Sequence, residues 1–188
     1  SAWITCGSSG QWTGWHAITT AALKKEEDCG RTNAAFIELD RSVLAAEGET
    51  VAFISDPGDG TCERLSARAL LVESVCAARF LVQECGASAD RRVAIFLPND
   101  LRPPVWIEAA KRLGVPYVAV ASGTASSSLA TRLEDTGAAV VVTCESLAAS
   151  VREALQMMDA PPTAVLAPTS TASPPQAVDG FLAATAGL

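Results

Sequence analysis

The cysteines and the single histidine are the side chains of this 188-residue sequence that could bind a metal or act as nucleophiles. A zinc site usually takes closely spaced cysteine pairs of the C-x-x-C type together with histidines, and the sequence has no such pair. It also lacks the G-x-S-x-G motif, which carries the nucleophilic serine of a hydrolase triad, so the histidine has no such serine to activate. We therefore expect no metal site and no nucleophilic catalysis from this set, which is His16, Cys6, Cys29, Cys62, Cys76, Cys85 and Cys144.

A second candidate for chemistry is a turn of small and hydroxyl residues at 121–128, Ala-Ser-Gly-Thr-Ala-Ser-Ser-Ser. It follows a predicted strand and precedes a predicted helix, where free backbone N–H groups can hold an anion. The alternative is a tight connection that only caps the helix. The phosphate-loop pattern G-x-x-x-x-G-K-[ST] is missing from the sequence, and the turn by itself leaves both interpretations open.

Turn signals and hydrophobic spacing predict regular elements from residue 51 onward. Two short apolar runs flank the Pro/Gly turn 56–60 and predict a hairpin over 51–65. A long helix is predicted from an N-cap at Ser66 to a C-cap at Gly86. Apolar strands then alternate with helices: the strands are predicted over 92–98, 115–121, 138–143 and 163–167, and the helices over 99–113, 126–136 and 145–158.

This alternation determines the fold class. Strands separated by helices of such length imply right-handed crossovers and a parallel sheet, and runs such as 92–98 and 115–121 are apolar enough to be buried on both faces. We predict an α/β fold with a mostly parallel sheet and helices on both of its faces. A small hairpin and an irregular N-terminal arm would precede that sheet.

The two ends of the chain differ in composition from the α/β domain between them, which we place at 33–167. Residues 1–32 are a Trp-rich arm with several Gly and Ser, and such aromatics dock either on their own domain or on a partner. Residues 168–188 begin as a Pro/Ser/Thr linker and finish with a short apolar stretch. The candidate partner-docking side chains are Trp3, Trp12, Trp15, Phe181 and Leu182.

Charge and hydropathy exclude some classes of partner. The formal net charge is −7 and there is no run of Lys or Arg, so we expect no nucleic-acid ligand. No apolar run approaches the roughly 18 residues that span a bilayer, so we expect a soluble chain for which peripheral association stays open. The cytoplasm or the interior of an organelle is the expected location, and the initial Ser1 is compatible with a removed presequence.

Several segments recur in the same order in one known family. They are 33–41 (NAAFIELDR), 48–53 (GETVAF), 91–98 (RRVAIFLP), 111–116 (KRLGVP) and 132–138 (RLEDTGA). On these residues the span from about 33 to 155 resembles the N-terminal part of AMP-forming acyl-CoA synthetases, the acetyl-CoA and propionyl-CoA synthetases above all. The run Ser122-Gly123-Thr124 is similar to the branch that activates propionate or 3-hydroxypropionate.

The resemblance implies a scaffold rather than a complete catalytic site. In this family a carboxylate and ATP form an acyl adenylate and CoA displaces AMP, so ATP, Mg²⁺ and CoA serve the full-length enzymes. The family's phosphate loop, adenine-binding motif, ribose-binding Asp and C-terminal Lys lie downstream of Leu188, and we expect no cofactor in this chain. Gly123 matches one Gly of the family's Gly-Gly motif near CoA, whereas 147–149 (LAA) replaces its Arg- and Gly-containing run.

Two functions fit this sequence. The first is a non-catalytic structural or linker subunit, a pseudoenzyme scaffold whose partners are other protein subunits. The second is the N-terminal fragment of a complete AMP-forming synthetase for acetate, propionate or 3-hydroxypropionate. In either case the 188 residues alone are not expected to catalyse adenylation, because that reaction needs oriented phosphate donors and a Lys or Mg²⁺ at the developing charge.

Overall fold

A parallel sheet lies at the centre of the computed structural model, which describes residues 33–88 and 90–167. Four strands run side by side in the order β4-β3-β5-β6, each hydrogen-bonded in parallel to its neighbour. Parallel strands need crossover connections, and the helices between them supply these. The strands are β3 (Arg92–Leu97), β4 (Tyr117–Ala121), β5 (Ala138–Thr143) and β6 (Thr163–Leu166).

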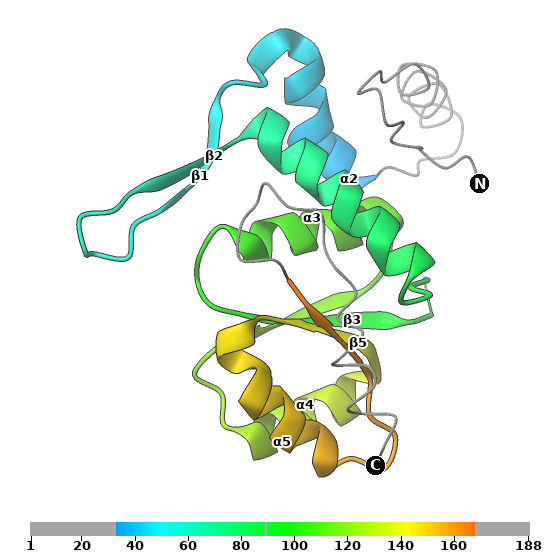
Figure 1. Cartoon of the computed structure of the whole chain (residues 1–188). Coiled ribbons are helices and arrows are strands. Elements are labelled where there is room, and N and C mark those ends of the chain that lie inside the picture. Colours follow the sequence, from blue (N-terminus) through cyan, green and yellow to red (C-terminus); the bar gives the residue numbers. More distant parts are fainter. Residues whose placement is uncertain (1–32, 89, 168–188) are drawn as a thin grey trace.

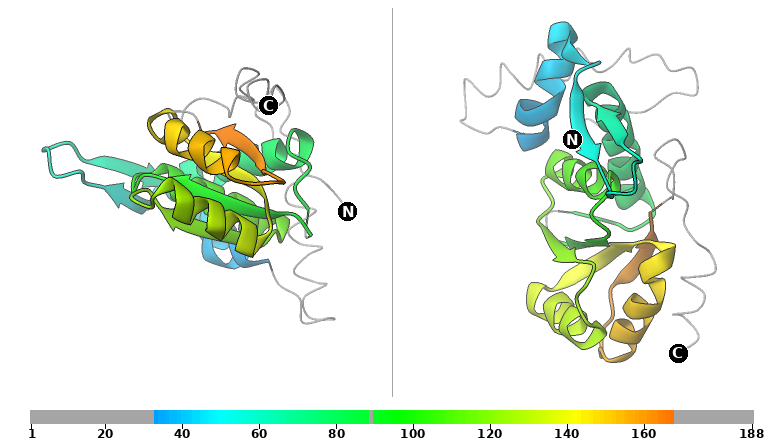
Figure 2. Two further views of the ribbon diagram at one scale, coloured as in Figure 1. Left: turned by 90° about the horizontal axis from the view of Figure 1, so that it is seen from below. Right: turned by 90° about the vertical axis from the view of Figure 1, so that its left-hand side faces the viewer.

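Helices cover both faces of this sheet, as Figures 1 and 2 show. The first pair packs together on one face and the second pair packs together on the other. Gly114 and Gly137 end two of these helices in the left-handed conformation, with φ of 67° and 60°, which a residue without a Cβ adopts readily. The pairs are α2 (Ala67–Gln83) with α3 (Arg102–Leu113), and α4 (Ser126–Thr136) with α5 (Ala148–Gln156).

The central strand β3 explains why the core has two parts. Successive side chains of a strand point to opposite faces, so Val93 and Ile95 enter the core beneath α2 and α3, whereas Ala94 and Phe96 enter the core beneath α4 and α5. All four are at most 2% exposed. The uninterrupted apolar run of this strand is therefore used on both faces, as predicted.

A hairpin and two short helical turns precede α2. The helical turns are η1 (Phe36–Asp40) and η2 (Val43–Glu47), and the antiparallel strands are β1 (Val51–Ser55) and β2 (Glu63–Ser66). Ser66 ends β2 and begins α2 at once, because its side-chain oxygen accepts a hydrogen bond from the backbone N–H of Ala69 at 3.2 Å. The hairpin stands apart from the sheet in Figure 1.

The predicted α/β fold is confirmed, including the parallel sheet, the helices on both faces and the preceding hairpin. One detail was wrong: the strand at 115–121 was expected to be buried, but β4 lies at the edge of the sheet and only Val120 on it is buried. Tyr117 is 40% exposed. Apolar composition predicted burial here, whereas the position of a strand in the sheet order decides it.

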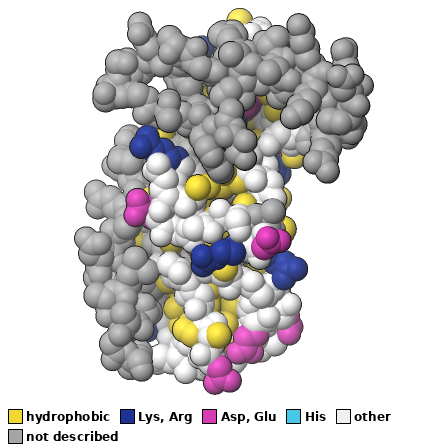
Figure 3. Space-filling view, turned by 90° about the vertical axis from the view of Figure 1, so that its right-hand side faces the viewer, with side chains coloured by type: hydrophobic (Ala, Val, Ile, Leu, Met, Phe, Trp, Pro, Cys, Tyr) yellow, Lys and Arg dark blue, Asp and Glu magenta, His cyan; other side chains and the backbone are white. Residues whose placement is uncertain are grey.

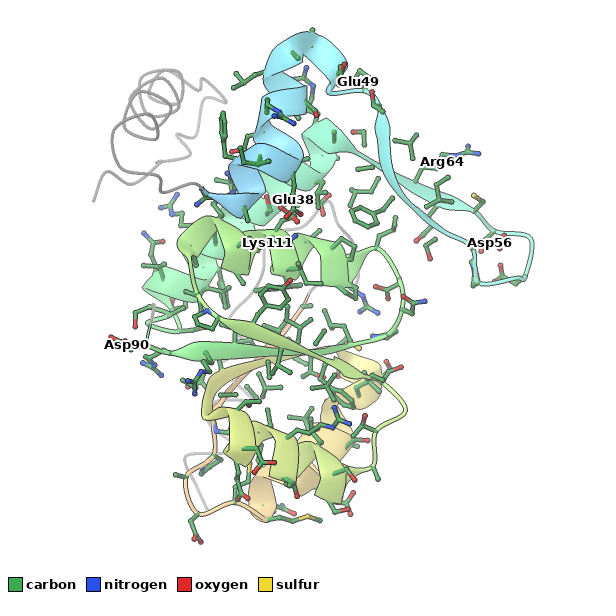
Figure 4. The ribbon with its side chains drawn as sticks, turned by 180° about the vertical axis from the view of Figure 1, so that it is seen from behind. Glu38, Glu49, Asp56, Arg64, Asp90 and Lys111 are labelled. Atoms are coloured by element: carbon green, nitrogen blue, oxygen red, sulfur yellow. The ribbon has the colours of Figure 1, made fainter. Side chains whose placement is uncertain are left out.

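Buried charges attach η1 to α3. Arg112 donates two hydrogen bonds to the carboxylate of Asp40, both at 2.7 Å, and a longer one to Ser74 at 3.3 Å. Beside this pair, Lys111 bonds both Glu38 and Glu108, and Figure 4 shows Glu38 and Lys111 facing each other between the two elements. Side chains from η1, α2 and α3 therefore meet in one polar cluster.

The side of the molecule seen in Figure 3 carries visible basic and acidic side chains interspersed among neutral ones. Among the residues that the structure describes, no helix combines the length and the apolar character that crossing a bilayer requires. The candidate docking residues Trp3, Trp12, Trp15, Phe181 and Leu182 all lie outside the described residues.

Candidate functional site

The order of the strands places a switch point between β3 and β5. These strands are neighbours, yet β3 leads into α3 on one face and β5 leads towards α5 on the other. In open α/β sheets, ligands bind at the carboxyl ends of two strands whose connections diverge in this way, because the diverging loops leave a crevice. The connections 98–101 and 144–147 border this point, and the second of these loops is coiled into the 3-10 helix η3 (Glu145–Leu147).

Asp100 and Arg102 supply the charges of the first loop. One carboxylate oxygen of Asp100 accepts the backbone N–H of Arg102 at 2.9 Å, which satisfies a free donor at the start of α3. The other oxygen accepts Nε of Arg102 at 2.9 Å and also Nη2. The hydrogen bonds to Asp100 raise the pKa of Arg102, with burial opposing the shift and the charge of Asp100 and the neighbouring Cys144 adding to it.

Cys144 and Ser146 supply the polar groups of the second loop. Cys144 is 1% exposed, and its Sγ lies 3.2 Å from Oγ of Ser146. Cys144 also interacts with the guanidinium of Arg102, so the two loops meet through an arginine, a carboxylate, a thiol and a hydroxyl. This arrangement can stabilise the loops or contact a polar ligand, but the guanidinium is already neutralised by Asp100.

The turn that contains Gly123 lies at the carboxyl end of β4. Here N–H of Thr124 bonds the carbonyl of Ala121 at 3.0 Å, and Ser126 donates its hydroxyl hydrogen to Glu153 at 2.7 Å. The helix that follows, α4, begins at Ser126, and its N-cap residue Ala125 makes no side-chain capping hydrogen bond. Gly123 is exposed, and a Cβ added to it would meet no atom within 4 Å. These contacts show a connection that also ties α4 to α5, and the proposed role of Gly123 near CoA stays a prediction.

Within 147–149, Leu147 and Ala148 have a packing role in the structure, whereas Ala149 is exposed. Leu147 packs against both core clusters, and Ala148 is buried at 8% exposure in the cluster beneath α4 and α5. Side chains that are used in this way are not available to hold a phosphate. The replacement of the family's Arg- and Gly-containing run therefore leaves an apolar start to α5.

Sequence reasoning missed the switch-point residues and the buried ion pair of η1. Asp100 and Arg102 lie within four residues of the end of the predicted strand 92–98, and Cys144 directly follows the predicted strand 138–143. Polar residues at the carboxyl ends of adjacent parallel strands were thus a usable signal. Within residues 33–88 and 90–167, no group of three or more His, Cys, Asp and Glu side chains is arranged to hold a metal ion.

Comparison with known proteins identifies a family. The sequence profile of the family described as "AMP-binding enzyme" matches residues 39–182, which is most of the chain. The acetyl-coenzyme A synthetases of Paraburkholderia phymatum and Burkholderia thailandensis are each 35% identical to it over 127 residues. Those 127 residues cover 68% of this chain and 19% of each relative. The chain therefore spans about a fifth of the length of these curated relatives.

A solved structure agrees with this. The crystal structure of Brucella canis acyl-CoA synthetase superposes on 82% of this chain and 27% of its own, with a TM-score of 0.63 and 26% sequence identity. The expected resemblance to the N-terminal part of acyl-CoA synthetases is confirmed by both comparisons. Matched over more than half its length by the family profile and by a relative above 30% identity, the chain belongs to the AMP-binding enzyme family.

Proposed function

We propose that this chain is a non-catalytic scaffold subunit of a larger assembly, built on the N-terminal part of the acyl-CoA synthetase fold. The observation that carries the proposal is at the switch point, where Arg102 is bound by Asp100 through its side chain. Adenylation needs cationic donors that are free to meet the phosphates of ATP. A guanidinium held by its own carboxylate is a poor donor for that purpose.

The rest of the described site supports the same role. The Gly123 turn serves to connect β4 to α4, and Ser126 of α4 is bonded to Glu153 of α5. The start of α5 contributes apolar side chains to the core. The side chains of Asp100, Arg102 and Ser126 are thus occupied with holding the fold together, as in a subunit whose task is structural. Its partners in this proposal are other protein subunits.

The alternative is that the 188 residues form the front portion of a complete AMP-forming synthetase. The specific observation in its favour is the coverage, because the match extends over only 19% of the acetyl-coenzyme A synthetases and 27% of the Brucella canis enzyme. In this alternative, ATP, Mg²⁺ and CoA would be bound by the remaining polypeptide. Acetate, propionate and 3-hydroxypropionate are its candidate substrates.

Native mass spectrometry of the protein, purified gently from its source, distinguishes the scaffold proposal from the synthetase alternative. The scaffold proposal expects a subunit of about the 19.4 kDa of this chain, released on activation from a heavier complex that contains other polypeptides. A single covalent polypeptide several times heavier, with this sequence at one end, would refute the scaffold proposal and establish the synthetase. Peptide mapping of the released subunit serves as the control for its identity.

A further inference from the structure

We draw no further inference here: the strongest candidate, the apolar surface that Val51, Phe53 and Ile54 expose on the hairpin β1–β2, carries none because nothing in the described part of the structure shows what covers it.

Discussion

Two ion pairs in the chain differ in burial, and burial decides how much stability is lost when one partner of a pair is removed. The Asp40 and Arg112 side chains are 4% and 11% exposed and meet through two hydrogen bonds of 2.7 Å. The Glu49 and Arg68 side chains are 83% and 60% exposed and meet through one bond of 2.9 Å. Removing one member of a buried pair leaves an uncompensated charge in a poorly solvated place, whereas water replaces the lost partner of an exposed one.

We therefore predict that Asp40→Ala lowers the free energy of unfolding by about 3–5 kcal/mol, and that the matched change Glu49→Ala lowers it by less than about 1 kcal/mol. Urea denaturation followed by circular dichroism measures both. If the two variants lost similar amounts of stability, Arg112 would not depend on Asp40 in the way the geometry indicates.

Cys85 makes the stability of the folded state decrease at alkaline pH. Burial raises the pKa of its thiol to about 11, the charge of Glu84 adds to the shift and Arg91 opposes it. The unfolded thiol titrates near 9.0, so the unfolded chain loses this proton first as pH rises. The contribution of Cys85 to stability is therefore complete below pH 9 and is lost as pH rises from about 9 to about 11.

The wild-type protein should accordingly lose stability between pH 8.5 and 10.5 more steeply than Cys85→Ala, by on the order of 1–2 kcal/mol. Cys62→Ala, which removes an exposed thiol, should keep the wild-type slope. Urea denaturation at the two pH values gives the comparison. A Cys85→Ala variant with the same slope as the wild type would show that the thiol is not desolvated.

At the scale of elements, the ends of helices depend on particular glycines. Gly114 has a φ of 67° and ends α3, with its N–H directed at the carbonyls of Ala110 and Lys111. A Cβ there would meet no atom within 4 Å, so its cost would come from the backbone conformation alone. Gly123 is equally open but does not have a positive φ.

Gly114→Ala should therefore lower the free energy of unfolding by about 1–2 kcal/mol, the cost of the left-handed conformation for a residue with a Cβ. Gly123→Ala should change it by less than about 0.5 kcal/mol, as a surface substitution does. Thermal unfolding measures both variants under identical conditions. Equal losses would mean that Gly123 is constrained by something other than the connection between β4 and α4.

Most elements were predictable from the sequence because their signals are local. Apolar runs, the N-cap at Ser66 and the terminating Gly114 and Gly137 each act within a few residues, and the strands and helices begin and end close to the predicted positions. The exposure of β4 and the pairing of Asp40 with Arg112, 72 residues away, depend on which elements become neighbours. Local patterns do not contain that information.

The same limit applies to the candidate site. Gly123 was chosen by its resemblance to a family motif, while Arg102 and Cys144 become neighbours because β3 and β5 lie side by side in the sheet and run parallel. A residue can be placed at the end of a strand from its position in the sequence. Which strand ends lie side by side follows from the strand order, and the order β4-β3-β5-β6 is set by packing of the whole sheet.

At the scale of the whole molecule, the chain has a packed α/β body and an arm that extends from it, as Figures 1 and 4 show. The apolar side chains of the body are buried in its two core clusters, whereas the hairpin leaves three large apolar side chains of one strand exposed. The proposed scaffold role would need a packed body of this kind together with a surface that binds a partner.

The absence of independent adenylation is the central claim, and it is tested most directly by the exchange of labelled pyrophosphate into ATP. The assay uses the purified 188-residue chain with Mg²⁺ and with acetate, propionate or 3-hydroxypropionate, and an intact acetyl-coenzyme A synthetase as the positive control. Our account predicts exchange at the level of buffer for every acid. Exchange that depends on the acid and is abolished by Arg102→Ala would contradict it, because the chain would then carry out the first half-reaction itself.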